Sequence, residues 1–146
     1  MAGDLIYEYT PQVVEVVEFG IAASALFSGA TPPPAEGGRL DLYLEGPVNG
    51  PKFSGTLKGV DYLRFRADGR AELHIHAAIT TDEGERVALE AGGVATPQEP
   101  PVFQLREHVS LTSNHPTLAW LNALEIWATG TVDVSTGRVH VQAYAF

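Results

Sequence analysis

Two histidines separated by one residue are the first side chains in this sequence that have the means to do chemistry. His74 and His76 lie in the stretch 72–79, where polar and apolar residues alternate. Alternate residues of a β-strand point to the same face, so both imidazoles share one face with Glu72. Imidazole titrates near neutral pH and can transfer protons. Both histidines are therefore predicted catalytic groups.

A carboxylate supplies the third catalytic candidate. Asp61 follows Gly59 by two residues and directly precedes Tyr62. At the mouth of a cavity, beside aromatic side chains, such a carboxylate has a raised pKa and can act as a general acid or base. The alternative is an aspartate that caps a turn by accepting hydrogen bonds from nearby backbone amides. The sequence leaves both interpretations open.

Other alternating segments also carry polar residues on one face. Together with nearby aromatic and cationic side chains they form the predicted substrate-binding set: Tyr62, Arg64, Arg106, His108, Trp120, Trp127 and His140. If these faces point into a barrel, they line a polar cavity; if they point outward, they form a solvated surface. Alternation does not choose between the two, because a shift of one residue in register exchanges the faces of a strand.

The His-x-His pattern also suggests a metal, since two imidazoles on one strand face converge as they do in cupins. A metal site needs three or four ligands in fixed geometry, and a third ligand such as Glu83 falls in a turn. Phosphate-binding loops and dinucleotide-binding motifs are absent as well. We therefore expect no metal ion and no other cofactor.

The elements that position these residues are short strands. Turn signals such as Asn49-Gly50, Lys58-Gly59, Asp68-Gly69 and Glu83-Gly84 separate alternating segments. The predicted strands cover residues 5–9, 12–19, 39–45, 52–58, 61–66, 70–80, 86–92, 102–112, 124–132 and 138–146. No amphipathic helices connect them, which excludes a parallel α/β fold. The predicted fold is all-β, a closed antiparallel β-barrel with one short helix after Pro116; a two-sheet sandwich is the alternative.

Length and composition set further limits. A chain of 146 residues predicts one domain, 1–146, with a flexible loop at about 20–38, where three consecutive prolines prevent regular structure. The formal net charge of −9 and the lack of a long apolar run argue against nucleic-acid and membrane partners. The absence of cysteine fits a cytoplasmic location. Leu40, Leu42, Leu44 and the Val-rich stretch 12–19 suggest a homodimer interface.

The order of several short motifs resembles the uncharacterised DUF3237 (UPF0311) family. The motifs are Gly50-Pro51 with Gly55, then Gly59 to Tyr62, Arg66 to Gly69, Thr81 to Gly84 and Trp120-Leu121-Asn122. The resemblance covers about residue 39 to the C-terminus and implies a small β-barrel, loosely like those of allene oxide cyclase and dirigent proteins, with no general activity assigned. The family usually has Gly-Gly-Ala-Asp-Trp at positions 58–62, and Asp and Arg in place of His74 and His76.

These observations leave two classes of function open. The first is a cofactor-independent acid–base enzyme, an isomerase, cyclase or lyase, that acts on a small, partly apolar organic molecule in the barrel. Asp61, His74 and His76 would move the protons. The second is a non-catalytic barrel that binds a small molecule. An enzyme requires an ionisable group with a shifted pKa deep in the cavity, whereas a carrier needs polar groups only at the rim.

Overall fold

A computed structural model describes residues 3–146, in which nine β-strands and two short helices follow one another. The strands are β1 (Asp4–Tyr9), β2 (Gln12–Glu18), β3 (Gly38–Asn49), β4 (Ser54–Phe65), β5 (Ala71–Thr81), β6 (Arg86–Pro97), β7 (Val102–Thr112), β8 (Ile126–Asp133) and β9 (Arg138–Ala145). The helices are α1 (Ala23–Ser28) and the 3-10 helix η1 (Ala119–Ala123). The all-β prediction is confirmed.

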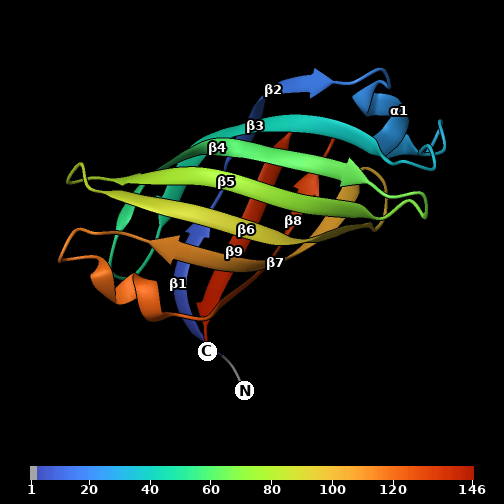
Figure 1. Ribbon diagram of the computed structural model, residues 1–146. Coiled ribbons are helices and arrows are strands. Elements are labelled where there is room, and N and C mark those ends of the chain that lie inside the picture. Colours follow the sequence, from blue (N-terminus) through green and yellow to red (C-terminus); the bar gives the residue numbers. More distant parts are fainter. Residues whose placement is uncertain (1–2) are drawn as a thin grey trace.

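The strands form one closed antiparallel barrel (Figure 1). From β3 to β9 each strand pairs with the next one in sequence, mostly through tight hairpins. β1 closes the barrel, because it pairs with β9 on one side and with the end of β3 on the other. β2 continues along β3 but meets β9 only through Gln12 and Arg138. β1 and β2 therefore share one position in the wall.

The apolar face of most strands points into the barrel, and β2 is the exception. Leu40, Leu42 and Leu44 on β3 are buried, and so are Leu73 and Ile75 on β5. Burying these side chains is the main stabilising contribution to such a fold. The leucines of β3 are therefore not available as a subunit interface, contrary to the prediction from the sequence. A homodimer stays a prediction, and only the exposed valines of β2 remain from the face proposed for it.

β4 corrects one prediction about turns. The structure has a single strand from Ser54 to Phe65 where the sequence suggested two strands separated by a turn at Lys58-Gly59. A side chain at Gly59 would run into the main chain of His76 and Ala77 on β5. Gly59 is thus needed for the close approach of β4 and β5 and does not mark a turn.

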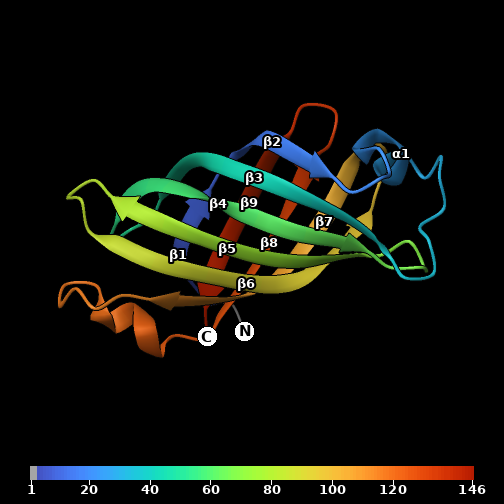
Figure 2. The same ribbon diagram turned by 45° about the horizontal axis from the view of Figure 1, so that its top comes forward.

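The two helices lie at opposite ends of the barrel (Figure 2). α1 follows β2 and packs Phe27 edge-on against Phe65 and Phe103. It occupies part of the 20–38 segment, for which flexibility stays a prediction. η1 lies beside the far ends of the strands, where Lys52 sits over the ring of Trp120. Within residues 3–146, no helix is long and apolar enough to cross a membrane.

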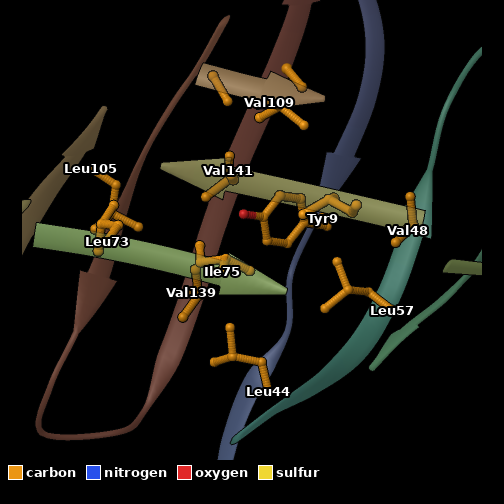
Figure 3. Close-up of a cluster of buried hydrophobic side chains, with 14 of the residues drawn as sticks. Tyr9, Leu44, Val48, Leu57, Leu73, Ile75, Leu105, Val109, Val139 and Val141 are labelled. Carbon is orange, nitrogen blue, oxygen red and sulfur yellow. The ribbon is translucent and has the colours of Figure 1, made fainter. Parts of the chain in front are cut away.

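The barrel is filled near η1 and hollow near α1. At the filled end, side chains such as Leu57, Val109 and Val141 are almost completely buried. Figure 3 shows Tyr9 in the middle of this apolar cluster, with Ile75 and Val141 beside its ring. Toward α1 the apolar side chains no longer meet across the barrel, and a cavity begins.

Candidate functional site

A cavity of about 530 Å³ occupies the α1 half of the barrel. This volume lies within the range of ordinary small-molecule sites. The wall is mostly aliphatic and aromatic, and includes Leu42, Leu63, Leu73, Leu105, Phe103 and Val139. At the mouth, Ser24 and Ser28 of α1 and Ser135 of the β8–β9 turn contribute hydroxyl groups. The site is thus an apolar cavity with a polar rim.

Two carboxyl groups mark the floor of the cavity. Along β4, Phe65 lies at the α1 end, Leu63 and Asp61 line the cavity, and Leu57 lies beyond it in the filled core. Along β7, Phe103, Leu105 and Glu107 line the cavity, and Val109 lies beyond it. Asp61 and Glu107 are therefore the deepest lining residues of their strands. Their side chains occupy positions that the neighbouring pattern fills with apolar residues.

Asp61 is only 5% exposed. The ladder between β4 and β5 is interrupted after the pair Asp61 and Ile75, and the backbone N–H of His74 instead donates to Oδ1 of Asp61 at 3.0 Å. Loss of hydration raises the pKa of Asp61 from 3.8 to about 7, and the charge of Asp41 adds to this, while the bond from His74 opposes it. Asp61 therefore changes its protonation state near neutral pH.

Glu107 is 2% exposed and hydrogen-bonds to Tyr9, whose hydroxyl donates to Oε1 at 3.1 Å. Loss of hydration raises the pKa of Glu107 from 4.5 to about 7. The hydrogen bond from Tyr9 lowers this pKa, and the negative charge of Asp61 raises it further. Because the two carboxyls interact, their protons belong to the pair rather than to either residue. Near pH 7 one of them can hold a proton while the other is ionised.

The structure places the predicted catalytic histidines outside the barrel. His74 and His76 are exposed on the outer face of β5, and the imidazole of His76 lies 3.8 Å from the carboxylate of Glu90. The opposite, apolar face of β5 carries Leu73 and Ile75 into the cavity. Of the two orientations that the sequence left open, the structure therefore has the outward one, because the barrel interior takes the apolar face.

Most of the predicted substrate-binding residues lie on the outer surface for the same reason. Exposed outer positions are occupied by Tyr62, Arg64, Arg106, His108, Trp127 and His140. Several pair there: His108 contacts Glu125 at 3.0 Å, and His140 contacts Glu8 at 2.5 Å. Trp120 is partly buried at the η1 end, away from the cavity. Of the residues predicted to form the site, the structure brings only Asp61 into it.

No group of three His, Cys, Asp or Glu side chains converges among residues 3–146 in a way that suits a metal ion. The two floor carboxyls are also the only acidic side chains among the residues that line the cavity. Among the described residues, Asp61 and Glu107 therefore supply the carboxyl groups of the cavity, and no third such ligand joins them.

The two tyrosines of β1 differ in one respect that can be tested. The hydroxyl of Tyr9 has Glu107 as a partner, whereas the hydroxyl of Tyr7 is fully buried and has no hydrogen-bond partner among the described residues. We expect Tyr7→Phe to leave the free energy of unfolding unchanged or to raise it by about 1 kcal/mol, because it removes an unsatisfied polar group. Tyr9→Phe should lower it by about 1–2 kcal/mol.

Urea unfolding of the two variants measures this difference directly. Both substitutions remove one oxygen atom from rings that stack on each other at 5.6 Å, so each variant serves as the control for the other. A loss of stability in Tyr7→Phe as large as that in Tyr9→Phe would contradict the assignment of Tyr7 as unpaired.

Fold and site together define a class of protein: a closed antiparallel β-barrel with an apolar cavity open at one end and an acidic floor. The chain belongs to the DUF3237 family, described as proteins of unknown function, whose sequence profile matches residues 35–146. The resemblance inferred from the motif order is confirmed. No match is found among curated proteins.

Solved structures share the fold. A protein of unknown function from Clostridium acetobutylicum is 21% identical, with a TM-score of 0.82 over 100% of this chain and 99% of that chain. A β-barrel-like protein from Acinetobacter baumannii is 17% identical, with a TM-score of 0.76 over 98% and 94% of the two chains. An enzyme from Penicillium herquei is 16% identical, with a TM-score of 0.61 over 99% and 96%. At these identities the likeness concerns the fold alone.

Proposed function

We propose that this protein is a cofactor-independent acid–base enzyme that acts on a small, partly apolar organic molecule in the barrel cavity. The observation that carries the proposal is the pair of buried carboxyls, Asp61 and Glu107, at the floor of an apolar cavity. Isomerisation, cyclisation and lyase reactions fit best, because they need a shaped cavity and groups that add or remove protons.

The two carboxyls have different roles, one as the general base and the other as the general acid. In the state with one shared proton, the ionised carboxylate abstracts a proton from the substrate, and the protonated partner donates a hydrogen bond or a proton to a substrate oxygen or nitrogen. Tyr9 holds Glu107 in place through its hydroxyl. The backbone N–H of His74 does the same for Asp61. The aliphatic wall excludes water and so strengthens both interactions.

The non-catalytic binding barrel is the alternative. A carrier needs polar groups only at its rim, and this cavity does have serines there. The two carboxyls, with pKa values of about 7, lie deep in the cavity and not at its rim, and this position favours the enzyme. That a similarly folded protein from Penicillium herquei is an enzyme agrees with this preference. The proposal includes a cytoplasmic location, which the lack of cysteine favours.

Proton transfer can be tested before the natural substrate is known. A small apolar ketone such as 2-tetralone should enter the cavity, and the protein should accelerate exchange of its α-protons with deuterium oxide. We expect Asp61→Asn to reduce the accelerated rate roughly 100-fold or more, as is typical of removing a general base. The rate should pass through a maximum near pH 7 and fall on either side, because the state in which one carboxyl is ionised and the other protonated is most populated there. Proton NMR measures the exchange.

His76→Ala is the matched control, because His76 is one of the sequence-predicted catalytic residues but lies on the outer wall. Its exchange rate should equal that of the unmodified protein. Glu107→Gln should slow the exchange as well, since the amide cannot protonate the ketone oxygen. If the wild-type rate does not exceed the rate of Asp61→Asn at any pH, then the floor carboxyl does not act as a base.

A further inference from the structure

The cavity contains acidic groups without a cationic partner. Its lining includes two carboxyls and the hydroxyl of Tyr9, but no Lys, Arg or His. The arginines and histidines of the neighbouring strands, such as Arg64, Arg106 and His108, are exposed on the outer face. Buried carboxyls are normally paired with a cation or satisfied by several hydrogen-bond donors. Here the described part of the chain supplies no cation from the cavity wall.

The hydrogen-bonding capacity of the floor is also incompletely used. Asp61 accepts one bond, to Oδ1 from the N–H of His74, and no bond within residues 3–146 reaches its Oδ2. Among the described residues, Glu107 accepts a side-chain hydrogen bond only from the hydroxyl of Tyr9, which lies 3.1 Å from Oε1 and 3.4 Å from Oε2. A carboxylate can accept about four hydrogen bonds. The floor therefore retains acceptor positions that a ligand with several N–H donors would fill.

We propose that the ligand of this cavity is a lipophilic amine. Its apolar body lies along the aliphatic wall formed by residues such as Leu63, Leu73 and Leu105, and one protonated nitrogen reaches the floor and donates hydrogen bonds to Asp61 and Glu107. This inference rests on the proposed site and adds the class of substrate.

Three classes of ligand compete, and charge distinguishes them. A carboxylate or phosphate would meet two acids and no cation, in a protein whose formal net charge is −9. A neutral alcohol supplies one donor and leaves part of the floor unsatisfied. An ammonium supplies three donors and a positive charge, and hydrogen bonds between charged partners are about twice as strong as neutral ones. The overall negative field also attracts a cation toward the mouth.

Three probes with one carbon skeleton test the inference: 4-phenylbutylamine, 4-phenylbutanol and 4-phenylbutyrate. Isothermal titration calorimetry at pH 8, where both carboxyls are mostly ionised, gives the three Kd values. We expect the amine to bind roughly 10- to 100-fold more tightly than the alcohol, and the carboxylate to bind most weakly. At pH 5.5 the preference for the amine should shrink, because the floor carboxyls are then protonated.

The double variant Asp61→Asn/Glu107→Gln keeps the shape of the floor and removes its charge. The amine should then bind within about 2-fold of the alcohol, while the Kd of the alcohol stays nearly constant. The variant His76→Ala/Glu90→Gln changes charge only on the outer wall and should keep the full preference for the amine. Equal binding of amine and alcohol to the wild-type protein would overturn the inference, and so would an amine preference that persists in the floor variant.

The result is independent of the deuterium-exchange test. If the exchange is catalysed but the amine is not preferred, the acid–base function stands and the ligand class is wrong. If the amine is preferred but no exchange is catalysed, the protein is a binding barrel for amines, and the proposed enzymatic function fails.

Discussion

The free energy of unfolding is expected to fall by several kcal/mol as the pH rises from about 4 to about 7, and to change little above that range. The cause is the raised pKa of two buried carboxyls. On folding, the pKa of Asp61 rises from 3.8 to about 7, and that of Glu107 rises from 4.5 to about 7. Between these limits the folded protein binds more protons than the unfolded chain, so raising the pH favours unfolding.

The size of the effect follows from the same numbers. One pKa unit corresponds to about 1.4 kcal/mol, so Asp61 alone accounts for roughly 4 kcal/mol and Glu107 for roughly 3 kcal/mol. The two contributions do not simply add, because the charge of one carboxyl raises the pKa of the other. Asp68, in a surface turn, and Asp133, at the end of β8, have lowered pKa values and act in the opposite direction only weakly.

Urea unfolding at pH 5 and pH 8 measures the difference. The variant Asp61→Asn/Glu107→Gln should be more stable than the wild-type protein at pH 8, and its stability should depend much less on pH. Replacement of only one of the two carboxyls should remove part of this dependence of the free energy of unfolding on pH. A wild-type protein that is equally stable at both pH values, or more stable at pH 8, would show that the floor carboxyls do not titrate as proposed.

Buried carboxyls that lower the free energy of unfolding at neutral pH are typical of functional sites. A leucine at position 61 or 107 would continue the apolar stripe of its strand and would cost nothing in hydration. Proteins usually violate a local rule of this kind at their functional sites. The expected loss of stability with rising pH is thus the thermodynamic counterpart of the acid–base chemistry proposed for the cavity.

Most of the barrel was predictable from the sequence because alternation and turn residues are local signals. The bounds predicted for the strand at 102–112 agree with β7, and the hairpins at Asp68-Gly69 and Glu83-Gly84 are present. The prediction of two strands in place of β4 was wrong. Lys58-Gly59 is typical of a turn, and only the position of the neighbouring strand β5 shows that it lies within a strand. The reason for Gly59 lies in the main chain of β5, which no local pattern contains.

The candidate site is harder to predict than the fold, because its carboxyls are marked by a break in the apolar pattern of a strand and not by an unusual residue type. In 102–112, Phe103, Leu105, Val109 and Leu111 alternate on one face, and Glu107 interrupts them. That interruption was the available signal for a buried functional carboxyl. Asp61 shares the face of Leu63 and Phe65 in the same way. The outward direction of His74 and His76 was left open by alternation alone, and the structure shows that the opposite, apolar face of β5 faces the barrel interior.

Two adjacent glycines in the wall beside Glu107, Gly92 and Gly93, should respond very differently to replacement by alanine. Gly93 pairs with Glu107 across β6 and β7, and a Cβ atom at Gly93 would overlap the main-chain carbonyl oxygen of Arg106. Neither Gly93 nor its neighbour Gly92 has a positive φ, so any difference comes from space and not from backbone conformation. We expect Gly93→Ala to lower the free energy of unfolding by about 3 kcal/mol, because β7 would have to move.

Gly92→Ala is the matched control. A Cβ at Gly92 would meet only the carbonyl oxygen of Leu73, at 3.7 Å, which is an ordinary contact. Alanine also loses less conformational freedom on folding than glycine, so this variant should be as stable as the wild-type protein or more stable by about 0.5–1 kcal/mol. Urea unfolding compares the two variants, and equal stabilities would refute the close approach of β6 and β7. Because Gly93 lies opposite Glu107, Gly93→Ala should also disturb the floor of the cavity and weaken binding of 4-phenylbutylamine, whereas Gly92→Ala should not.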